Sequence, residues 1–321
     1  GRGSFFVTEA DEAYGSFLKL EPTIAVVTNI DDDHLDYYGS VGALVGAFKE
    51  FLLKVPPSGA AILCMDDPRV RELASQIGRR ALGYGLDCEG AGCPGAGVEI
   101  YAQNISLEGF NSSFEAFYGQ RRLGRVELKV PGRHNIYNAL ASIGVALEIG
   151  IDMETVFRAL KLFRGVKRRC QVIGDVDGIL IMDDYAHHPT EIRTTLRALK
   201  EGTGRRVIAV FQPQRFTRTH LLLQEFARSF GYADEVVVTE IYFEGTGEKP
   251  IPGIDGQRLA KAIEEYEGRK VNFFPGKEEV VEFLLKEGRP GDLIVTMGAG
   301  DIWKVAEEVV GKIGGRGIGG L

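Results

Sequence analysis

The stretch that decides the fold is Gly178-Ile179-Leu180-Ile181-Met182, followed directly by Asp183-Asp184-Tyr185-Ala186-His187-His188-Pro189. An apolar, strand-like run ends in a turn with two carboxylates, a phenol and two imidazoles, and a helical pattern then runs from Thr190 to Leu199. Proteins of the α/β class place ligand sites at such turns. Helix capping by Asp183 or Asp184, with Pro189 in the first turn, is the simpler interpretation. Capping explains neither the histidines nor the tyrosine, so the turn predicts a ligand site.

Around this stretch, strand and helix patterns alternate and predict a six-stranded, doubly wound, Rossmann-like domain. Its expected strands are near Gln171 to Asp175, Ile179 to Asp183, Val207 to Phe211, Glu235 to Thr239, Val271 to Phe274 and Leu293 to Met297. The Gly-basic stretch Gly165-Val166-Lys167-Arg168-Arg169 marks its start. We therefore expect domains at 1–166 and 167–313, with a Gly-rich flexible tail at 314–321.

The first domain is predicted to be α/β with a mainly parallel sheet. Strands are expected near Phe5 to Glu9, Ile24 to Asn29, Ala60 to Met65 and Arg80 to Tyr84, and helices around Val41 to Leu53, Pro68 to Ile77, Asn135 to Ile149 and Met153 to Leu162. Polar-apolar alternation between Val98 and Val130 indicates antiparallel strands.

Composition narrows the class of protein. The 321 residues are 44% hydrophobic and carry a formal net charge of -7, which does not favour nucleic acid or a membrane surface as partner. No apolar run approaches the ~18 residues of a membrane span, and no signal-peptide pattern is present, so we expect a cytoplasmic protein. The four cysteines are interpreted as free thiols, the alternative being a zinc site or disulfide from Cys88 and Cys93.

Two strand ends in the first domain carry acidic and imidazole groups. Glu9 follows the first expected strand, and Asn29-Ile30-Asp31-Asp32-Asp33-His34-Leu35-Asp36 follows the second. If the two strands are neighbours, Glu9 and His34 can reach one divalent cation, and this donor set suits Mg²⁺ or Mn²⁺ better than zinc. A solvated acidic turn with a surface histidine is the alternative.

Two further segments carry polar ligand groups. Pro131-Gly132-Arg133-His134-Asn135-Ile136-Tyr137-Asn138 presents His134, Asn135 and Asn138 at a helix N-terminus, where a polar ring or an anion can bind. Gln212-Pro213-Gln214-Arg215-Phe216-Thr217-Arg218-Thr219 follows a strand, and Arg215 and Arg218 can clamp a carboxylate or phosphate. Simple capping and a solvated basic loop are the respective alternatives.

Taken in order, these segments resemble the Mur ligases over nearly the whole chain. The resemblance rests on Glu9-Ala10-Asp11-Glu12, Asn29 to Asp36, Pro131 to Asn135, Phe163-Arg164-Gly165-Val166-Lys167-Arg168-Arg169, Asp183 to Pro189, Gln212 to Thr219 and Thr296-Met297-Gly298-Ala299-Gly300-Asp301-Ile302.

The resemblance implies an ATP-dependent ligase, whose best-matching member type joins L-alanine to the lactyl carboxylate of UDP-N-acetylmuramate through an acyl phosphate. It implies Mg²⁺ at Glu9 and His34. ATP contacts fall on His134, Asn135, Asn138, Arg168, Arg169 and Asp184. Substrate contacts fall on Tyr185, His187, Arg215 and Arg218, and catalytic roles on His34, His187 and Asp184. The oligomeric state is not predicted.

The sequence departs from the family pattern at three places. Gln214 stands where the family usually has His, and Ala13-Tyr14 where it has Ser-Asp. No lysine is followed by Ser or Thr, so the phosphate loop ending in Gly-Lys-Thr is absent, and Gly90-Ala91-Gly92-Cys93-Pro94-Gly95 is interpreted as a surface loop. Without the phosphate loop, we expect this chain alone to be inactive or nearly so. The sequence also starts without Met, so we expect the natural protein to extend upstream and the first sheet of this chain to have an exposed edge strand.

Three other functions stay open from the sequence. The chain can be a non-catalytic module that binds nucleotide or an amino acid, since Arg215, Arg218, Asp184 and His134 are present. It can belong to the related ligase that recycles murein peptides. A metal-dependent hydrolase using Asp31 to Asp36 is disfavoured because nothing supplies a positioned nucleophile.

Overall fold

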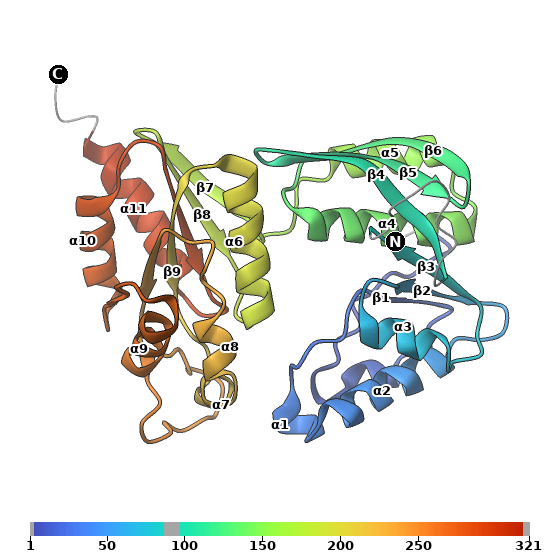
Figure 1. Ribbon diagram of the computed structural model, residues 1–321, viewed down its shortest axis with the longest axis horizontal. Coiled ribbons are helices and arrows are strands. Elements are labelled where there is room, and N and C mark those ends of the chain that lie inside the picture. Colours follow the sequence, from blue (N-terminus) through green and yellow to red (C-terminus); the bar gives the residue numbers. More distant parts are fainter. Residues whose placement is uncertain (1–2, 87–96, 317–321) are drawn as a thin grey trace. The chain divides into compact units, whose positions relative to one another are not determined.

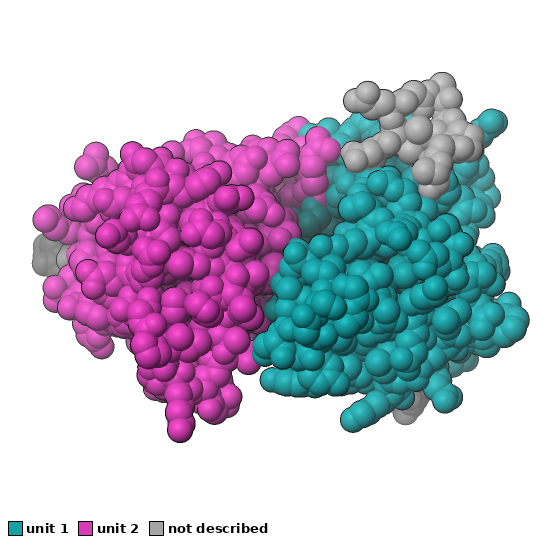
Figure 2. All heavy atoms as spheres, turned by 60° about the horizontal axis from the view of Figure 1, so that its bottom comes forward, with its two compact units in different colours: residues 1–106, 113–127, 134–162 teal, residues 107–112, 128–133, 163–321 magenta. Residues whose placement is uncertain are grey.

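The structure is a computed structural model that describes residues 3–86 and 97–316 (Figure 1). The chain divides into two compact units, coloured separately in Figure 2. Unit 1 comprises residues 1–106, 113–127 and 134–162, and unit 2 comprises residues 107–112, 128–133 and 163–321. The tips of the strands in the Val98 to Val130 region thus cluster with the second unit.

Unit 1 is built on a six-stranded sheet with the order β1-β2-β3-β4-β5-β6. The strands are β1 (Ile24–Val27), β2 (Ala60–Cys64), β3 (Ala81–Gly85), β4 (Val98–Glu108), β5 (Asn111–Tyr118) and β6 (Arg121–Leu128). β1 to β4 are parallel, and two-residue turns join β4 to β5 and β5 to β6, which makes these hairpins antiparallel. The helices are η1 (Ala13–Lys19), α1 (Leu35–Tyr38), α2 (Val41–Leu53), α3 (Pro68–Ala74), α4 (Arg133–Ile149) and α5 (Met153–Leu162).

The expected strand at Phe5 to Glu9 is wrong. Residues 5–12 form no regular element, and Phe6 and Val7 are 90% and 91% exposed. An apolar run becomes a strand only when a neighbour pairs with it and covers one face. No such neighbour is present among the described residues, and β1 forms the edge of this sheet.

Unit 2 contains the predicted doubly wound sheet, with the order β11-β10-β9-β12-β8-β7. Its strands are β7 (Gln171–Val176), β8 (Ile179–Asp184), β9 (Arg206–Phe211), β10 (Glu235–Val238), β11 (Asn272–Phe273) and β12 (Asp292–Met297). All neighbours are parallel except β7 and β8. Its helices are α6 (Pro189–Thr203), α7 (Phe216–Leu221), α8 (Leu223–Ala227), α9 (Gly256–Glu267), α10 (Lys277–Glu287) and α11 (Trp303–Arg316).

The central strands of unit 2 are apolar on both faces because helices cover both faces. Leu293 and Val295 of β12 join one core with residues of α6, α8 and α9. Ile294, on the opposite face, joins a second core with residues of α10 and α11. The prediction of α/β architecture with mainly parallel sheets is confirmed.

Three smaller expectations can be compared with the structure. Helix α11 continues to Arg316, three residues into the segment expected to be a flexible tail. Cys64 and Cys170 are free thiols, whereas Cys88, Cys93 and the Gly90 to Gly95 loop lie outside the described residues. Within the described ranges, no helix has both the length and the apolar character needed to cross a membrane.

Candidate functional site

The predicted ligand loops of unit 2 lie along one edge of its sheet. β8 ends at Asp184, β9 ends just before Gln212, and β12 ends just before Gly298. Because these three strands are parallel neighbours, their carboxyl ends meet at the same edge, the place where open α/β sheets bind ligands. The predicted substrate and nucleotide residues of this unit therefore share one region.

The adjacent arginines Arg168 and Arg169 have different surroundings. The Arg168 side chain is 18% exposed, and its guanidinium donates to Asp183 Oδ2 at 2.8 Å, to the Gly298 carbonyl at 2.7 Å and to the Gly300 carbonyl at 3.2 Å. The Arg169 side chain is 47% exposed and pairs with Glu191 at 2.9 Å. The Arg168 guanidinium is thus held by three contacts within the protein, whereas the Arg169 side chain is more exposed.

Asp184 is only 2% exposed, and both of its carboxylate oxygens accept hydrogen bonds. The amide of Ala186 donates to Oδ1 at 2.7 Å, and the amide of Cys170 and the hydroxyl of Thr195 donate to Oδ2 at 2.8 and 3.4 Å. Burial raises the pKa of Asp184 despite these donors. The carboxylate fixes the path of the chain from Asp184 to Ala186.

Tyr185 and His187 form an aromatic group beside the arginines. The Tyr185 ring lies 5.0 Å from the Arg168 guanidinium and 5.7 Å from that of Arg169, and it meets the His187 ring edge to face at 5.4 Å. Tyr185 is 37% exposed, and cation-π contacts of this kind favour a fixed ring. The two residues predicted to contact substrate thus lie close together.

Glu191, which the sequence reasoning did not single out, organises this group. Its carboxylate accepts from the amides of His187 and His188 at 3.0 and 3.2 Å and pairs with Arg169. Burial would raise the pKa of Glu191, but His187 and Arg169 outweigh burial and lower that pKa. The sequence did contain a signal for Glu191. It stands three residues after His188, the N-cap of α6, and a glutamate at this spacing is typical of a capping box.

The predicted clamp residues Arg215 and Arg218 lie in and just before α7. Arg215 has a left-handed backbone, with φ 69° and ψ 129°, and its Nε donates to Glu248 Oε1 at 2.7 Å. Arg218 is 9% exposed. Burial would raise the pKa of Glu248, but hydrogen bonds from Arg215 and Thr217 lower it. No sequence signal pointed to Glu248, since it stands 33 residues from Arg215.

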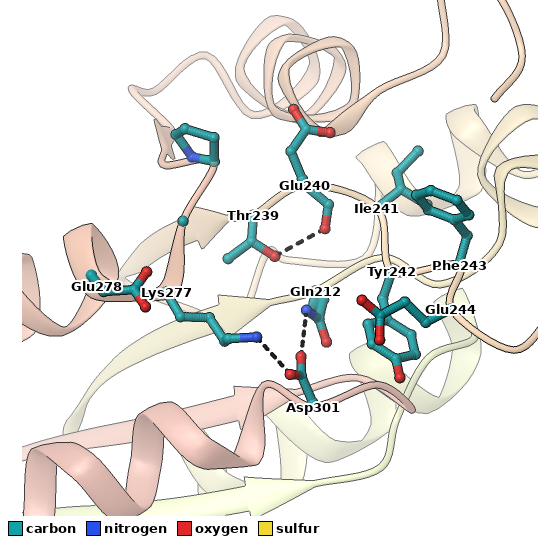
Figure 3. A pocket seen from close by; sticks show the side chains of 12 residues that line it. Gln212, Thr239, Glu240, Ile241, Tyr242, Phe243, Glu244, Lys277, Glu278 and Asp301 are labelled. Atoms are coloured by element: carbon teal, nitrogen blue, oxygen red, sulfur yellow. Dashed lines mark hydrogen bonds and ion pairs between the residues drawn. The ribbon is translucent and has the colours of Figure 1, made fainter.

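Beyond β9 and β12, Asp301 lines a cavity of about 290 Å³ together with Gln212, Lys277 and Tyr242. Lys277 Nζ donates to Asp301 Oδ2 at 2.6 Å and Gln212 Nε2 to Oδ1 at 3.2 Å (Figure 3). Burial opposes ionisation of Asp301, but hydrogen bonds from Lys277, Gln212 and Lys304 lower its pKa to about 2. Asp301 is therefore an anchored carboxylate.

In unit 1, the structure brings His34 together with Asp11 and Glu12. One ligand atom from each lies within 4.8 Å of the others, and His34 Nε2 is 3.6 Å from Glu12 Oε1. His34 has a left-handed backbone with φ 56°. Glu9 is exposed and is not part of this group. Two carboxylates and an imidazole are donors that a divalent cation accepts.

His134, Asn135 and Asn138 lie in the first two turns of α4, as the turn-to-helix pattern predicted. Asn135 Nδ2 is 3.0 Å from His134 Nε2, and Asn138 Nδ2 donates to Asn135 Oδ1 at 3.4 Å. Asn135 and Asn138 share a face because they are three residues apart in a helix. The three polar side chains form one group at the helix N-terminus.

The chain belongs to the Mur ligase family. Residues 3–146 match the Mur ligase middle domain, and residues 168–300 match the glutamate ligase domain of Mur ligases.

Among its relatives are enzymes named UDP-N-acetylmuramate--L-alanine ligase. The one from Pelotomaculum thermopropionicum is 47% identical over 313 residues, which are 98% of this chain and 66% of the relative. The one from Geotalea uraniireducens is 43% identical over 315 residues, which are 98% of this chain and 67% of the relative. The chain thus spans about two thirds of the length of these relatives.

Solved structures agree with the architecture. The UDP-N-acetylmuramate-alanine ligase MurC from Thermotoga maritima is 26% identical with a TM-score of 0.74, over 94% of this chain and 62% of that chain. MurF ligase from Thermotoga maritima, solved in complex with ADP, has a TM-score of 0.71 over 94% of this chain and 66% of that chain, and at 18% identity it supports the fold alone.

Proposed function

We propose that this protein is an ATP-dependent ligase that joins L-alanine to the lactyl carboxylate of UDP-N-acetylmuramate in the synthesis of peptidoglycan precursors, in the cytoplasm. The observation that carries the proposal is 47% identity to an enzyme of that name across 98% of the chain. In the proposed reaction the carboxylate is first phosphorylated and the amine of L-alanine then displaces phosphate. Such chemistry develops negative charge, which fixed cationic donors stabilise.

The cationic side chains of unit 2 fit this chemistry. Arg215 and Arg218 would hold the carboxylate of L-alanine, with Tyr185 and His187 bordering the same pocket. The 2.7 Å contact from Glu248 supports this role for Arg215, because it fixes the direction of the guanidinium. Arg169, whose side chain is 47% exposed, would contact the nucleotide. Asp184 would act by holding these loops, since its carboxylate is buried.

The residues of unit 1 fit a magnesium ion and the nucleotide base. His34 and one or more of Glu9, Asp11 and Glu12 would hold Mg²⁺, which when bound neutralises phosphate charge. His134, Asn135 and Asn138 would meet the adenine through their ring and amide groups. The donor set of Asp11, Glu12 and His34 supports the metal assignment.

A second candidate function is ligand binding without turnover by this chain. Its support is that no lysine is followed by Ser or Thr, so the sequence lacks the loop that cradles transferring phosphates in the family. The chain does contain Arg169, Arg215 and the α4 group, which are the residues that this function would use for binding.

Phosphate release by the chain with Mg-ATP, UDP-N-acetylmuramate and L-alanine, each omitted in turn, tests the first function. Release that requires all three components supports the ligase and contradicts the expectation that the chain alone is inactive. Calorimetry with ADP tests the second function. The Arg169→Ala variant should lose heat of binding, whereas the control Arg158→Ala, an exposed position in α5, should not. A folded chain that releases no phosphate shows that this chain alone does not turn over, and one that also binds no ADP contradicts the second candidate.

A further inference from the structure

The loop Gly298–Asp301, which follows β12, is held by side chains that come from three other segments of unit 2. Arg168 donates to the carbonyls of Gly298 and Gly300. The side-chain amide of Gln212 donates to Asp301, and its backbone amide donates to the carbonyl of Met297 at 2.9 Å. Lys277 also donates to Asp301, as Figure 3 shows. The shape of this loop therefore depends on contacts from outside it.

The loop fits these contacts only with glycine at both carbonyl positions. A Cβ at Gly298 would lie 2.6 Å from the Gln212 carbonyl oxygen, and one at Gly300 would lie 2.3 Å from Gln212 Oε1. Gly298 also has φ 145°, in the region that favours glycine. The backbone thus approaches Gln212 closely while its carbonyls reach the Arg168 guanidinium.

Arg168 joins this loop to the end of β8. Its Nε donates to Asp183 Oδ2, and Thr296 Oγ1 donates to Asp183 Oδ1 at 2.7 Å, so the carboxylate, 1% exposed, has a partner on each oxygen. Arg168 itself has φ 60°, which positions its carbonyl to accept from the Tyr185 amide at 2.6 Å. All three nitrogens of its guanidinium are used inside the protein.

We infer that Arg168 is a positioning residue that fixes the Gly298–Asp301 loop against Asp183 and orients Tyr185 and Arg169, rather than a residue that touches the nucleotide. The positioning role of Arg168 does not depend on the proposed function. Only the identity of the ligand that Tyr185 and Arg169 would contact rests on it. Arg169 is then the member of the arginine pair with a head available to an anion.

The single tryptophan of the sequence offers a test that needs no ligand. Trp303 begins α11 two residues after Asp301, so we expect its fluorescence to change when the loop changes. Lysine cannot reproduce the planar fork of arginine, so Arg168→Lys loses at least one carbonyl contact. We expect acrylamide to quench Trp303 about twofold more strongly in Arg168→Lys than in the parent chain, by loss of these charge-assisted bonds. The matched control Arg169→Lys should quench as the parent does.

Nucleotide binding provides the second readout. We expect Arg168→Lys to weaken ADP binding about tenfold through the displaced Tyr185 and Arg169, with Trp303 more accessible. Arg169→Lys should weaken ADP binding with Trp303 unchanged. Methylguanidinium added to Arg168→Ala should restore the parent's quenching, an effect that a general loss of stability would not give.

The outcomes separate the two proposals. Unchanged quenching in Arg168→Lys, or equal quenching in Arg168→Lys and Arg169→Lys, overturns the positioning role. Absence of ADP binding by the parent chain counts against the proposed function and leaves the quenching result decisive for Arg168. If Arg168→Lys fails to fold, Asp183→Asn provides the milder variant, because the amide keeps one acceptor oxygen for Arg168 while the charge and one acceptor are lost. It should raise quenching of Trp303, and parent-like quenching in folded Asp183→Asn overturns the inference.

Discussion

Several of the predicted ligand loops contain a non-glycine residue with a positive φ. His34, Arg168 and Arg215 have φ of 56°, 60° and 69°. Such conformations cost about 1–3 kcal/mol each and persist where the surroundings impose them. Charge-assisted hydrogen bonds from the Arg168 and Arg215 side chains to Asp183 and Glu248 contribute to holding these two residues in place.

The strain at Arg215 predicts an unusual order of stability between two substitutions. Arg215→Gly should have a free energy of unfolding about 1 kcal/mol higher than Arg215→Ala, because glycine adopts a positive φ without a clash. At Arg218, inside α7, the order should reverse. Arg218→Ala should have a free energy of unfolding about 1 kcal/mol higher than Arg218→Gly, because glycine destabilises a helix. Urea unfolding of the four variants measures both differences, and the same order at both sites would contradict the strain.

Asp301 predicts how stability depends on pH. Its pKa is about 2 in the folded chain, below the ordinary value of 3.8, so it stabilises the fold above about pH 4 and loses this effect as pH falls toward 2. Allowing for solvent screening, we expect the parent chain at pH 6 to have a free energy of unfolding on the order of 1 kcal/mol higher than the Asp301→Asn variant. Chemical denaturation between pH 6 and pH 2.5 should show the two converging, and a difference independent of pH would refute the assignment.

The sequence could identify site residues where one segment carries several polar groups, as at Asp183 to Pro189. It could not identify Glu248, whose partner Arg215 is 33 residues away, because a hydrogen bond between distant segments leaves no local pattern. The choice between Arg168 and Arg169 was also beyond it, since both have the same chemistry and only burial separates them.

At the scale of elements, prediction succeeded where strands are apolar on both faces. β8, β9 and β12 are bounded by turn residues and fully or nearly fully buried, so length and composition suffice to locate them. Phe5 to Glu9 has similar residues but no pairing partner in the described chain, and composition does not reveal the partner. The mixed order of the second sheet also could not be obtained from composition, since it depends on which distant strands pair.

The N-terminus of α6 predicts a separation between two roles of Glu191. Glu191→Ala should lower the free energy of unfolding by about 1 kcal/mol, because the capping acceptor is lost. Glu191→Gln keeps an acceptor oxygen and should cost less than half as much, while removing the charge beside Arg169. Urea denaturation compares the two variants, and equal losses would mean that the charge pair and not the cap stabilises the helix.

At the scale of the whole molecule, each unit has its own apolar core. Leu63 is fully buried in unit 1 and Leu284 in unit 2. Either leucine replaced by alanine should lower the stability of its own unit by about 2–5 kcal/mol. Because Trp303 is in unit 2, Leu284→Ala should shift the unfolding transition seen by tryptophan fluorescence. Leu63→Ala should shift only part of the far-ultraviolet circular dichroism transition, and an equal fluorescence shift in both variants would show that the units unfold together.

The position of β12 between β8 and β9 affects how the chain can fold while it is being synthesised. β12 is the last strand of its sheet in sequence but occupies the centre, so β8 and β9 have no common neighbour until Asp292–Met297 has left the ribosome. Pairings of such long sequence separation form slowly and leave apolar strand edges uncovered in the meantime. A nascent chain halted before Asp292 would hold every arginine of the predicted ligand loops and still lack the strand that brings those loops together.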